Sequence, residues 1–181
     1  VMVNNGLICN DGLYEMDFPL LEEQAADPDA KIMILCSPHN PVGRVWTKEE
    51  LARVGEICKK NNVLVIADEI HSDLVYAGYV HTPFALASDA PHLLCTSLGK
   101  TFNVAGLRLA NIFSSSAELK KQYDQEIDAY SYSASNTFGL EMVQAAYSPE
   151  GEAWLEELLV YLQGNVEVVS EWCQKHNVGF T

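Results

Sequence analysis

The chain has 181 residues, of which 48% are hydrophobic and 20% are charged, which is typical of a soluble globular domain and excludes a largely disordered chain. Its formal net charge is -14 at pH 7, so most of its surface would repel nucleic-acid phosphates and anionic membranes. No apolar stretch reaches the roughly 18 residues that a membrane span needs, and the N-terminus lacks a signal-peptide pattern. We therefore expect neither a nucleic-acid partner nor a membrane partner.

Residues 31–96 alternate short apolar runs with helical periodicity, which predicts βαβ units and a mostly parallel sheet. The runs KIMILCS (31–37) and VLVIADE (63–69) have strand length and are apolar enough for strands buried on both faces. Two further runs, HLLCTS (92–97) and LRLANIF (107–113), follow at intervals too short for full crossovers. Part of the sheet is therefore expected to use other connections. The predicted fold class is α/β, with helices flanking the sheet.

A helix is predicted between the first two strands. Thr47 and Glu50 have the spacing of a capping box, and the basic pair at 59–60 suits a helix C-terminus. The apolar side chains expected on its buried face are Leu51, Val54, Ile57 and Cys58.

From residue 115 onward the pattern is helical. Ser115 and Glu118 again have capping-box spacing, and a second helix is predicted over 134–147. The side chains expected to point inward from that helix are Phe138, Val143 and Ala146. Pro149 is then expected to break the chain.

Apolar residues next recur at steps of three and four over 154–173, which predicts a long amphipathic helix. Its end is expected to lead out of the domain. We find no internal repeat, low-complexity tract or Gly/Ser linker, so nothing in the sequence divides residues 1–150.

The cysteines and histidines favour neither a disulfide framework nor a metal site. The cysteines are odd in number and include no C-x-x-C pair, which predicts reduced thiols in a cytoplasmic protein. No histidine has metal-ligand spacing with cysteines or carboxylates, so no metal site is expected. The cysteines concerned are Cys9, Cys36, Cys58, Cys95 and Cys173.

Polar residues follow three of the predicted strands. Asn40 follows the first, Asp68 and His71 follow the second, and Ser97 and Lys100 follow the third. Ligands of open α/β sheets bind beyond the carboxyl ends of strands, and neighbouring strands would bring these groups together. An amide, a carboxylate, a hydroxyl and a lysine at one crevice suit a small polar ligand that needs proton transfer and charge stabilisation.

Each of these residues also has a purely structural interpretation. The sequence Asn-Pro-Val-Gly at 40–43 is a good turn, Asp68 is a possible helix N-cap, and Lys100 is a possible solvated loop residue. A lone histidine after a strand, such as His71, is commonly a hydrogen-bonded bystander.

Three segments together carry a resemblance to a known family. They are SPHNPVGRVWTKEEL (37–51), ADEIHSDLVY (67–76) and SLGKTFNVAGLR (97–108). In order and spacing they resemble the pyridoxal-phosphate enzymes of the class I/II aminotransferase family, fold type I, and most of all its cystathionine β-lyase branch of MalY/PatB type. Because three phased motifs at successive strand ends are hard to produce by chance, the resemblance is specific over roughly residues 31–110.

The resemblance implies pyridoxal 5'-phosphate as the cofactor. Lys100 matches the lysine that bonds covalently to the cofactor aldehyde and later removes the Cα proton of the substrate. Ser97 and Arg108 match the ligands of the cofactor phosphate. Asp68 matches the aspartate that pairs with the pyridine nitrogen and keeps it protonated.

Asn40 and His71 would lie on the ring-oxygen side of the cofactor. Asn40 matches an asparagine that hydrogen-bonds this oxygen, and the resemblance implies a cis bond to Pro41. His71 stands where many aminotransferases carry a tyrosine; the lyase branch often has histidine there, which favours a lyase. Gly99 stands where relatives frequently have serine, which removes one possible phosphate contact.

The activity implied is a carbon–sulfur β-lyase that converts L-cystathionine or related cysteine conjugates to a thiol, pyruvate and ammonia. An aminotransferase using the same residues is the alternative. A regulatory or binding protein with this fold is a third possibility; the acidic surface favours it, whereas the presence of Lys100 disfavours it.

The resemblance also bears on domain organisation and assembly. Family chains are longer than this one, so residues 1–150 are expected to form part of the cofactor-binding large domain. Residues 151–181 are expected to form a helix at the start of the connection to a small domain. Relatives are homodimers with the active site at the subunit boundary, so a homodimer is expected for the full-length protein, and this stretch alone is expected to be inactive.

Overall fold

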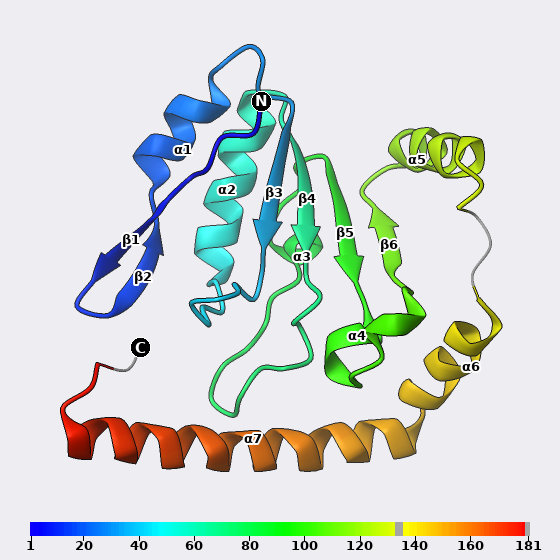
Figure 1. Cartoon of the computed structure of the whole chain (residues 1–181). Coiled ribbons are helices and arrows are strands. Elements are labelled where there is room, and N and C mark those ends of the chain that lie inside the picture. The colour runs from blue at the N-terminus through cyan, green and yellow to red at the C-terminus, as the bar shows by residue number, and fades with distance from the viewer. Residues whose placement is uncertain (133–135, 180–181) are drawn as a thin grey trace.

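The computed structural model describes residues 1–132 and 136–179. A four-stranded sheet forms its centre (Figure 1), and the spatial order of the strands follows the chain: β3 (Ile32–Cys36), β4 (Leu64–Asp68), β5 (His92–Thr96) and β6 (Asn111–Ser114). β3, β4 and β5 are parallel, whereas β6 is antiparallel to β5. The predicted α/β class and mostly parallel sheet are confirmed, and the connection from β5 to β6 joins antiparallel strands, as expected for part of the sheet. The prediction that the interval before β5 is also too short for a crossover is wrong, because β5 is parallel to β4.

A β-hairpin and a short helix precede this sheet. β1 (Leu7–Asn10) pairs with β2 (Leu13–Met16), and helix α1 (Phe18–Ala25) follows. Asp11 and Gly12 join the two strands with φ values of 49° and 86°, as a two-residue hairpin turn of type I′ requires. The predicted elements do not include this hairpin, although an Asp-Gly pair between apolar segments is a strong hairpin signal.

Helix α2 (Lys48–Lys60) packs on one face of the sheet and forms the core with it. The capping box of Thr47 and Glu50 is present, as predicted, and the four apolar residues expected on the inner face are all buried. They meet Leu35, Val65 and Ala67 from the strands, together with Phe84 of the short helix α3 (Phe84–Ala87). The prediction for this helix is confirmed. Its capping box and its apolar face are signals local in sequence, so they do not depend on the rest of the fold.

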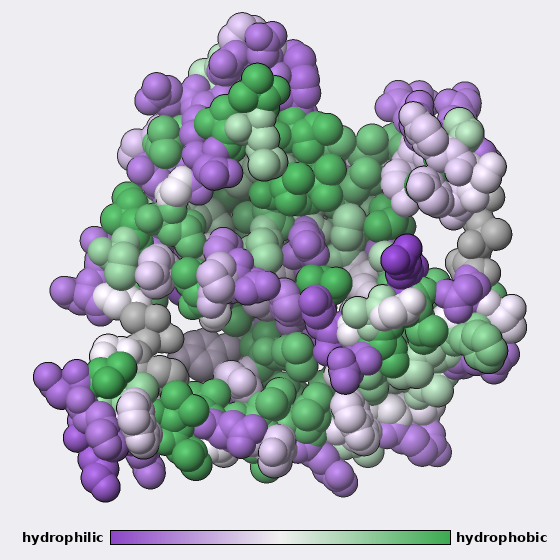
Figure 2. All heavy atoms as spheres, in the orientation of Figure 1, coloured by the Kyte–Doolittle hydropathy of each residue, from purple (hydrophilic) through white to green (hydrophobic). Residues whose placement is uncertain are grey.

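The opposite face of the sheet is open over β3, so the prediction that this strand is buried on both faces is wrong. The side chains of Ile32 and Ile34 are 57% and 68% exposed. The parallel register puts Ile34 beside Ile66, on the face away from α2 and α3. Figure 2 shows hydrophobic side chains gathered over this part of the sheet.

Helices follow the sheet, as predicted, but two of their starts differ. α5 (Ala117–Ala129) has Ser116 as its N-cap, and the Ser116 hydroxyl accepts from the Leu119 amide at 3.2 Å. The predicted cap, Ser115, instead extends the β5–β6 pairing: its hydroxyl accepts from the His92 amide at 2.9 Å. The capping-box spacing of Ser115 and Glu118 therefore does not mark the start of this helix.

Helix α6 (Thr137–Ala146) begins after Asn136, and residues 134–135 of the predicted helix lie outside the described part of the chain. Ala146 is buried and Val143 is half-buried, as expected. Phe138, however, is 78% exposed, so the prediction that it points inward is wrong. It lies in the first turn of the helix, on the side that no described element covers.

The last helix, α7 (Pro149–His176), runs along one side of the molecule (Figure 1). Pro149 separates two helices, as predicted, because α6 ends at Ala146 and α7 begins at Pro149. It occupies the first turn after the N-cap Ser148, where its missing N–H has no helical partner to lose. Trp154 stacks on Phe102, with 5.2 Å between ring centroids. No helix in the described residues is both long and apolar enough to cross a membrane.

Candidate functional site

The carboxyl ends of three strands lie side by side. The register pairs Cys36 with Asp68 and Asp68 with Cys95, so the ends of β3, β4 and β5 form one edge of the sheet. Asp68 stands in the middle of this edge. The loops that carry the other predicted site residues leave from the same three positions.

Asp68 is half-buried and holds the first turn of the loop after β4. Its Oδ1 accepts a hydrogen bond from the Ile70 amide at 3.2 Å. The residue does not cap a helix, because the chain continues as turns and the next helix, α3, begins at Phe84. The interpretation of Asp68 as a helix N-cap is therefore wrong, and one of its carboxylate oxygens is left without a hydrogen bond among the described residues.

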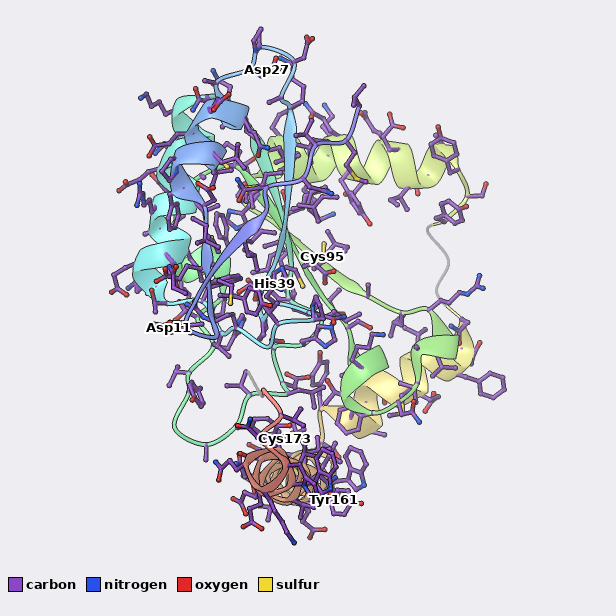
Figure 3. The ribbon with its side chains drawn as sticks, turned by 60° about the vertical axis from the view of Figure 1, so that its left-hand side comes forward. Asp11, Asp27, His39, Cys95, Tyr161 and Cys173 are labelled. Atoms are coloured by element: carbon purple, nitrogen blue, oxygen red, sulfur yellow. The ribbon has the colours of Figure 1, made fainter. Side chains whose placement is uncertain are left out.

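The neighbouring Glu69 is buried, and its carboxylate contacts two later residues of the chain. One oxygen accepts from the Phe84 amide at 2.7 Å, and the other lies 2.8 Å from His81 Nε2. The Cys95 thiol lies next to these acids. Burial raises the pKa of Cys95, and the charges of Asp68 and Glu69 raise it further. Cys95 therefore remains a neutral thiol beside the central carboxylate. Figure 3 labels both Cys95 of β5 and His39 of the loop after β3.

Lys100 lies on α4 (Leu98–Thr101), a single helical turn that follows β5. Its side chain is exposed, while Gly99 and Thr101 on either side are buried. Ser97 caps the turn: its hydroxyl accepts from the Gly99 amide at 3.0 Å and donates to the Leu109 carbonyl at 2.7 Å. Lys100 is thus presented from a short, capped turn and not from a loose loop.

A side-chain hydrogen bond joins the loops after β4 and β5. Thr101 Oγ1 donates to Asp73 Oδ2 at 2.8 Å, across 28 residues of sequence. Neither residue was among those predicted for the site. Both lie inside the quoted segments that carry the family resemblance, yet no spacing rule pairs them.

Arg108 follows the short 3-10 helix η1 (Ala105–Leu107) and has left-handed backbone angles, φ 50° and ψ 47°. Its side chain is exposed. In the described part of the chain, neither Arg108 nor Lys100 forms an ion pair. Two free cations near one strand end favour an anionic ligand.

A cavity of about 250 Å³ lies between these turns. Ser97, Gly99 and Arg108 line it together with Ile70, and the remaining lining is apolar or glycine. The backbone at Gly99 is closely approached, since a Cβ there would lie 3.1 Å from Ser97 Oγ and 3.3 Å from Ala105 Cα. The structure therefore brings Ser97 and Arg108 together at one cavity. Asp68 and Lys100 do not line it, although Ile70 and Gly99, which are near them in the chain, do.

Asn40 and His71 do not line that cavity. Asn40 is exposed, and its bond to Pro41 is cis, as the resemblance implies. The turn interpretation of 40–43 is also right, because Gly43 has φ 71° and donates to the His39 carbonyl at 2.8 Å. His71 is half-buried.

Two buried polar atoms near Asn40 lack partners among the described residues: Ser37 Oγ and His39 Nδ1. Burial lowers the pKa of His39. The described residues contain no group of three or more His, Cys, Asp or Glu side chains arranged to hold a metal. In chemical terms the site offers a half-buried carboxylate, a lysine amine and an exposed arginine at adjoining strand ends.

The sequence profile of the family "Aminotransferase class I and II" matches residues 11–181. Cystathionine beta-lyase PatB of Bacillus subtilis is 39% identical over 91% of the chain and 43% of its own length. Protein MalY of Escherichia coli is 34% identical over 94% of the chain and 43% of its own length. A crystal structure of the PLP-bound C-S lyase from Staphylococcus hominis superposes with a TM-score of 0.87 at 36% identity, covering 96% of this chain and 44% of that one. The chain thus spans less than half the length of these relatives.

Proposed function

The chain belongs to the class I and II aminotransferase family, and on that premise we propose that the whole protein is a pyridoxal-phosphate-dependent carbon–sulfur β-lyase. The proposed substrates are L-cystathionine and related cysteine conjugates. The Cβ–S and Cα–N bonds break, the sulfur leaves as a thiol, and water supplies the oxygen of pyruvate as ammonia is released. The names of the PatB relative and of the Staphylococcus hominis structure support a lyase over an aminotransferase.

The observation that carries the proposal is the placement of the predicted groups at the adjoining ends of β4 and β5, beside one cavity. The cavity is lined by Ser97, Gly99 and Arg108, which lie before and after Lys100 in the sequence. Ile70 also lines it, and the Ile70 amide donates a hydrogen bond to Asp68 Oδ1. An amine, an acid and a free guanidinium thus stand at adjoining strand ends. These are the groups that a phosphorylated pyridine aldehyde requires.

The residues fit this cofactor. Arg108 would bind the phosphate through its guanidinium, since no described carboxylate pairs with it. Asp68 would hold the pyridine nitrogen with the carboxylate oxygen that accepts no hydrogen bond in the described part of the chain. Asn40 and His71 would lie on the ring-oxygen side. Pyridoxal phosphate, when bound, supplies an electron-accepting ring that makes the Cα proton of an amino acid removable.

Lys100 has the central part in the proposed reaction. Its amine would hold the cofactor aldehyde covalently and, once released by the substrate amine, would take the proton from Cα. Its exposed position on α4 leaves the side chain free to move between these tasks. The Asp68 carboxylate would stabilise the protonated ring throughout, because it stays in place at the end of β4.

Ser97 is the one residue whose expected role conflicts with its hydrogen bonds. Its single proton is donated to the Leu109 carbonyl, and a lone pair accepts from the Gly99 amide. A donor role toward phosphate would require the hydroxyl to leave Leu109. We propose instead that Ser97 chiefly holds α4 and the entry to β6 together, and that Arg108 provides most of the phosphate affinity.

The experiment uses the whole protein loaded with pyridoxal phosphate. Borohydride reduction followed by peptide mapping is expected to fix the cofactor on Lys100. L-Cystathionine supplied without any keto acid is expected to release pyruvate continuously, well beyond one equivalent per cofactor. Pyruvate release that stops at one equivalent and resumes on adding a keto acid would identify an aminotransferase instead.

The matched controls are Lys100→Ala and Lys60→Ala. The first is expected to abolish both the reduced covalent product and turnover. The second removes an exposed lysine at the end of α2, remote from the strand ends, and should change neither. A reduced product on any lysine other than Lys100 would overturn the assignment.

We further propose a cytoplasmic homodimer. The five cysteines are all free, as is usual in a reducing compartment. The homodimer rests on the family resemblance, and light scattering of the whole protein tests it. A monomer that is fully active would contradict it.

A further inference from the structure

We propose that Asp73 and Thr101 are positioning residues that fix Lys100 relative to Asp68; this inference rests on the function proposed above. Thr101 follows Lys100 directly, and Asp73 lies five residues after Asp68. The bond between Thr101 Oγ1 and Asp73 Oδ2, 2.8 Å long, therefore connects the segment that presents the amine to the segment that presents the acid.

The turn that carries Lys100 is too short to hold itself. α4 has four residues, and an isolated helical turn is unstable because its nucleation fixes several dihedrals for one hydrogen bond. Its orientation must come from contacts outside the helix. Ser97 provides one such contact at the N-terminal end, through Leu109. At the C-terminal end, Phe102 stacks on Trp154 of α7, and the Asp73 link is the contact there that leads to the loop after β4.

The backbone sheet does not provide this connection. β4 and β5 are paired up to Asp68 and Cys95, and the Glu69 amide donates once more to the Cys95 carbonyl at 2.8 Å. Beyond that point the two chains separate into turns. Lys100 lies five residues past the last pair, so its distance from Asp68 depends on how these turns are tied together.

The two partners of this bond differ in their access to water. Thr101 is only 2% exposed, so its hydroxyl has little access to water as an alternative partner. Asp73 is half-buried and keeps some contact with solvent, so it tolerates loss of the hydroxyl better than a buried acid would. Removing the hydroxyl is therefore expected to release the turn without leaving a buried unpaired charge.

The experiment compares Thr101→Val, Thr101→Ser and Asp73→Ala in the whole protein loaded with pyridoxal phosphate. Thr101→Val keeps the shape and removes the donor, whereas Thr101→Ser keeps the donor. For Thr101→Val we expect kcat to fall about tenfold or more with little change in KM, because small misplacements of a reacting group cost rate and not binding. Thr101→Ser is expected to restore most of the loss.

Two readouts do not depend on turnover. The absorbance of the lysine–cofactor linkage is titrated with pH, and the rate at which the apoprotein takes up pyridoxal phosphate is followed in the same spectra. Thr101→Val and Asp73→Ala are expected to shift the titration in the same direction and to slow uptake. The double variant is expected to match either single variant, because both changes remove the same bond.

The inference is overturned if Thr101→Val loses only thermal stability while its kcat, titration and uptake match the wild type. Additive effects of Thr101→Val and Asp73→Ala would overturn it equally. Failure of the proposed function would look different, since the wild-type protein itself would then take up no pyridoxal phosphate on Lys100.

Discussion

The buried Glu69 carboxylate closes the loop that follows β4 by bonding to His81, twelve residues later. The Glu69 Oε2 atom lies 2.8 Å from His81 Nε2, and Oε1 accepts from the Phe84 amide at 2.7 Å. Glu69 is 2% exposed, so both bonds are shielded from water. The segment 69–84, which carries His71 and Asp73, is therefore anchored at both of its ends.

Replacing Glu69 should destabilise the protein strongly. Glu69→Ala would leave the Phe84 amide and the His81 ring without their partner in a buried place, at an expected cost of about 2–4 kcal/mol in the free energy of unfolding. Glu69→Gln keeps the shape and one acceptor and should cost less. Urea unfolding measures both. The exposed Glu56 of α2 provides the control, since Glu56→Gln should stay within about 0.5 kcal/mol of the wild type.

Gly55 should not tolerate a side chain. A Cβ at this position would lie 1.9 Å from Ser88 Oγ and 2.4 Å from Ser88 Cβ, so α2 would have to move away from the segment after α3. We expect Gly55→Ala to lower the free energy of unfolding by about 1–3 kcal/mol. Gly164 of α7 is the matched control, because nothing lies within 4 Å of a Cβ there. Gly164→Ala should be neutral or stabilising, since alanine favours helix; equal effects at the two sites would contradict the close packing of α2.

Arg108 should discriminate pyridoxal phosphate from pyridoxal. If its guanidinium binds the phosphate, Arg108→Gln should weaken the affinity for pyridoxal phosphate about tenfold or more. The affinity for pyridoxal, which lacks the phosphate, should hardly change. Spectroscopic titration of the apoprotein with each compound checks this. Parallel losses for both compounds would mean that Arg108 acts on the fold and not on the phosphate.

His39 should make stability depend on pH on the acidic side. Burial lowers its pKa in the folded chain below the usual 6.5. Between 6.5 and that lowered value the unfolded chain binds a proton that the folded chain does not, so stability falls as the pH falls through this window. His39→Phe removes the titration and keeps an aromatic ring against Trp46, which the His39 ring meets edge-on at 5.7 Å.

The measurement is urea unfolding of the wild type and of His39→Phe from pH 7.5 to pH 5. Above 6.5 the difference in unfolding free energy between the two proteins should be constant. Below 6.5 the wild type should lose stability relative to the variant. Parallel pH profiles over the whole range would show that His39 does not contribute.

The sequence by itself determined the elements whose signals are local. The capping box of Thr47 and Glu50 and the apolar face behind it define α2 without reference to the rest of the molecule. The apolar runs define the strands, and the polar residues after them identify the edge of the sheet where the site lies. The three phased motifs identify the family, because their spacing is a property of the chain alone. The division at residue 150 stays a prediction.

Other sequence signals needed the structure to be resolved. Ser115 has the capping-box spacing with Glu118, yet Ser116 is the cap, because the Ser115 hydroxyl accepts a hydrogen bond from the first residue of β5. Pro149 interrupts the helical run, as predicted, and only the structure shows that it also begins the next helix, after the cap at Ser148. Phe138 has the spacing of an inward residue, yet the described elements leave it exposed.

The tertiary structure alone decided how the site is held together. The pairings of Thr101 with Asp73 and of Glu69 with His81 join residues 28 and 12 positions apart, and no periodicity relates them. A hydrogen bond depends on distances of a few tenths of an ångström and on direction, whereas sequence patterns specify only which face or end a residue occupies. The chemical groups at the strand ends are therefore determined by the sequence, whereas the positions in which they are held are determined by the fold.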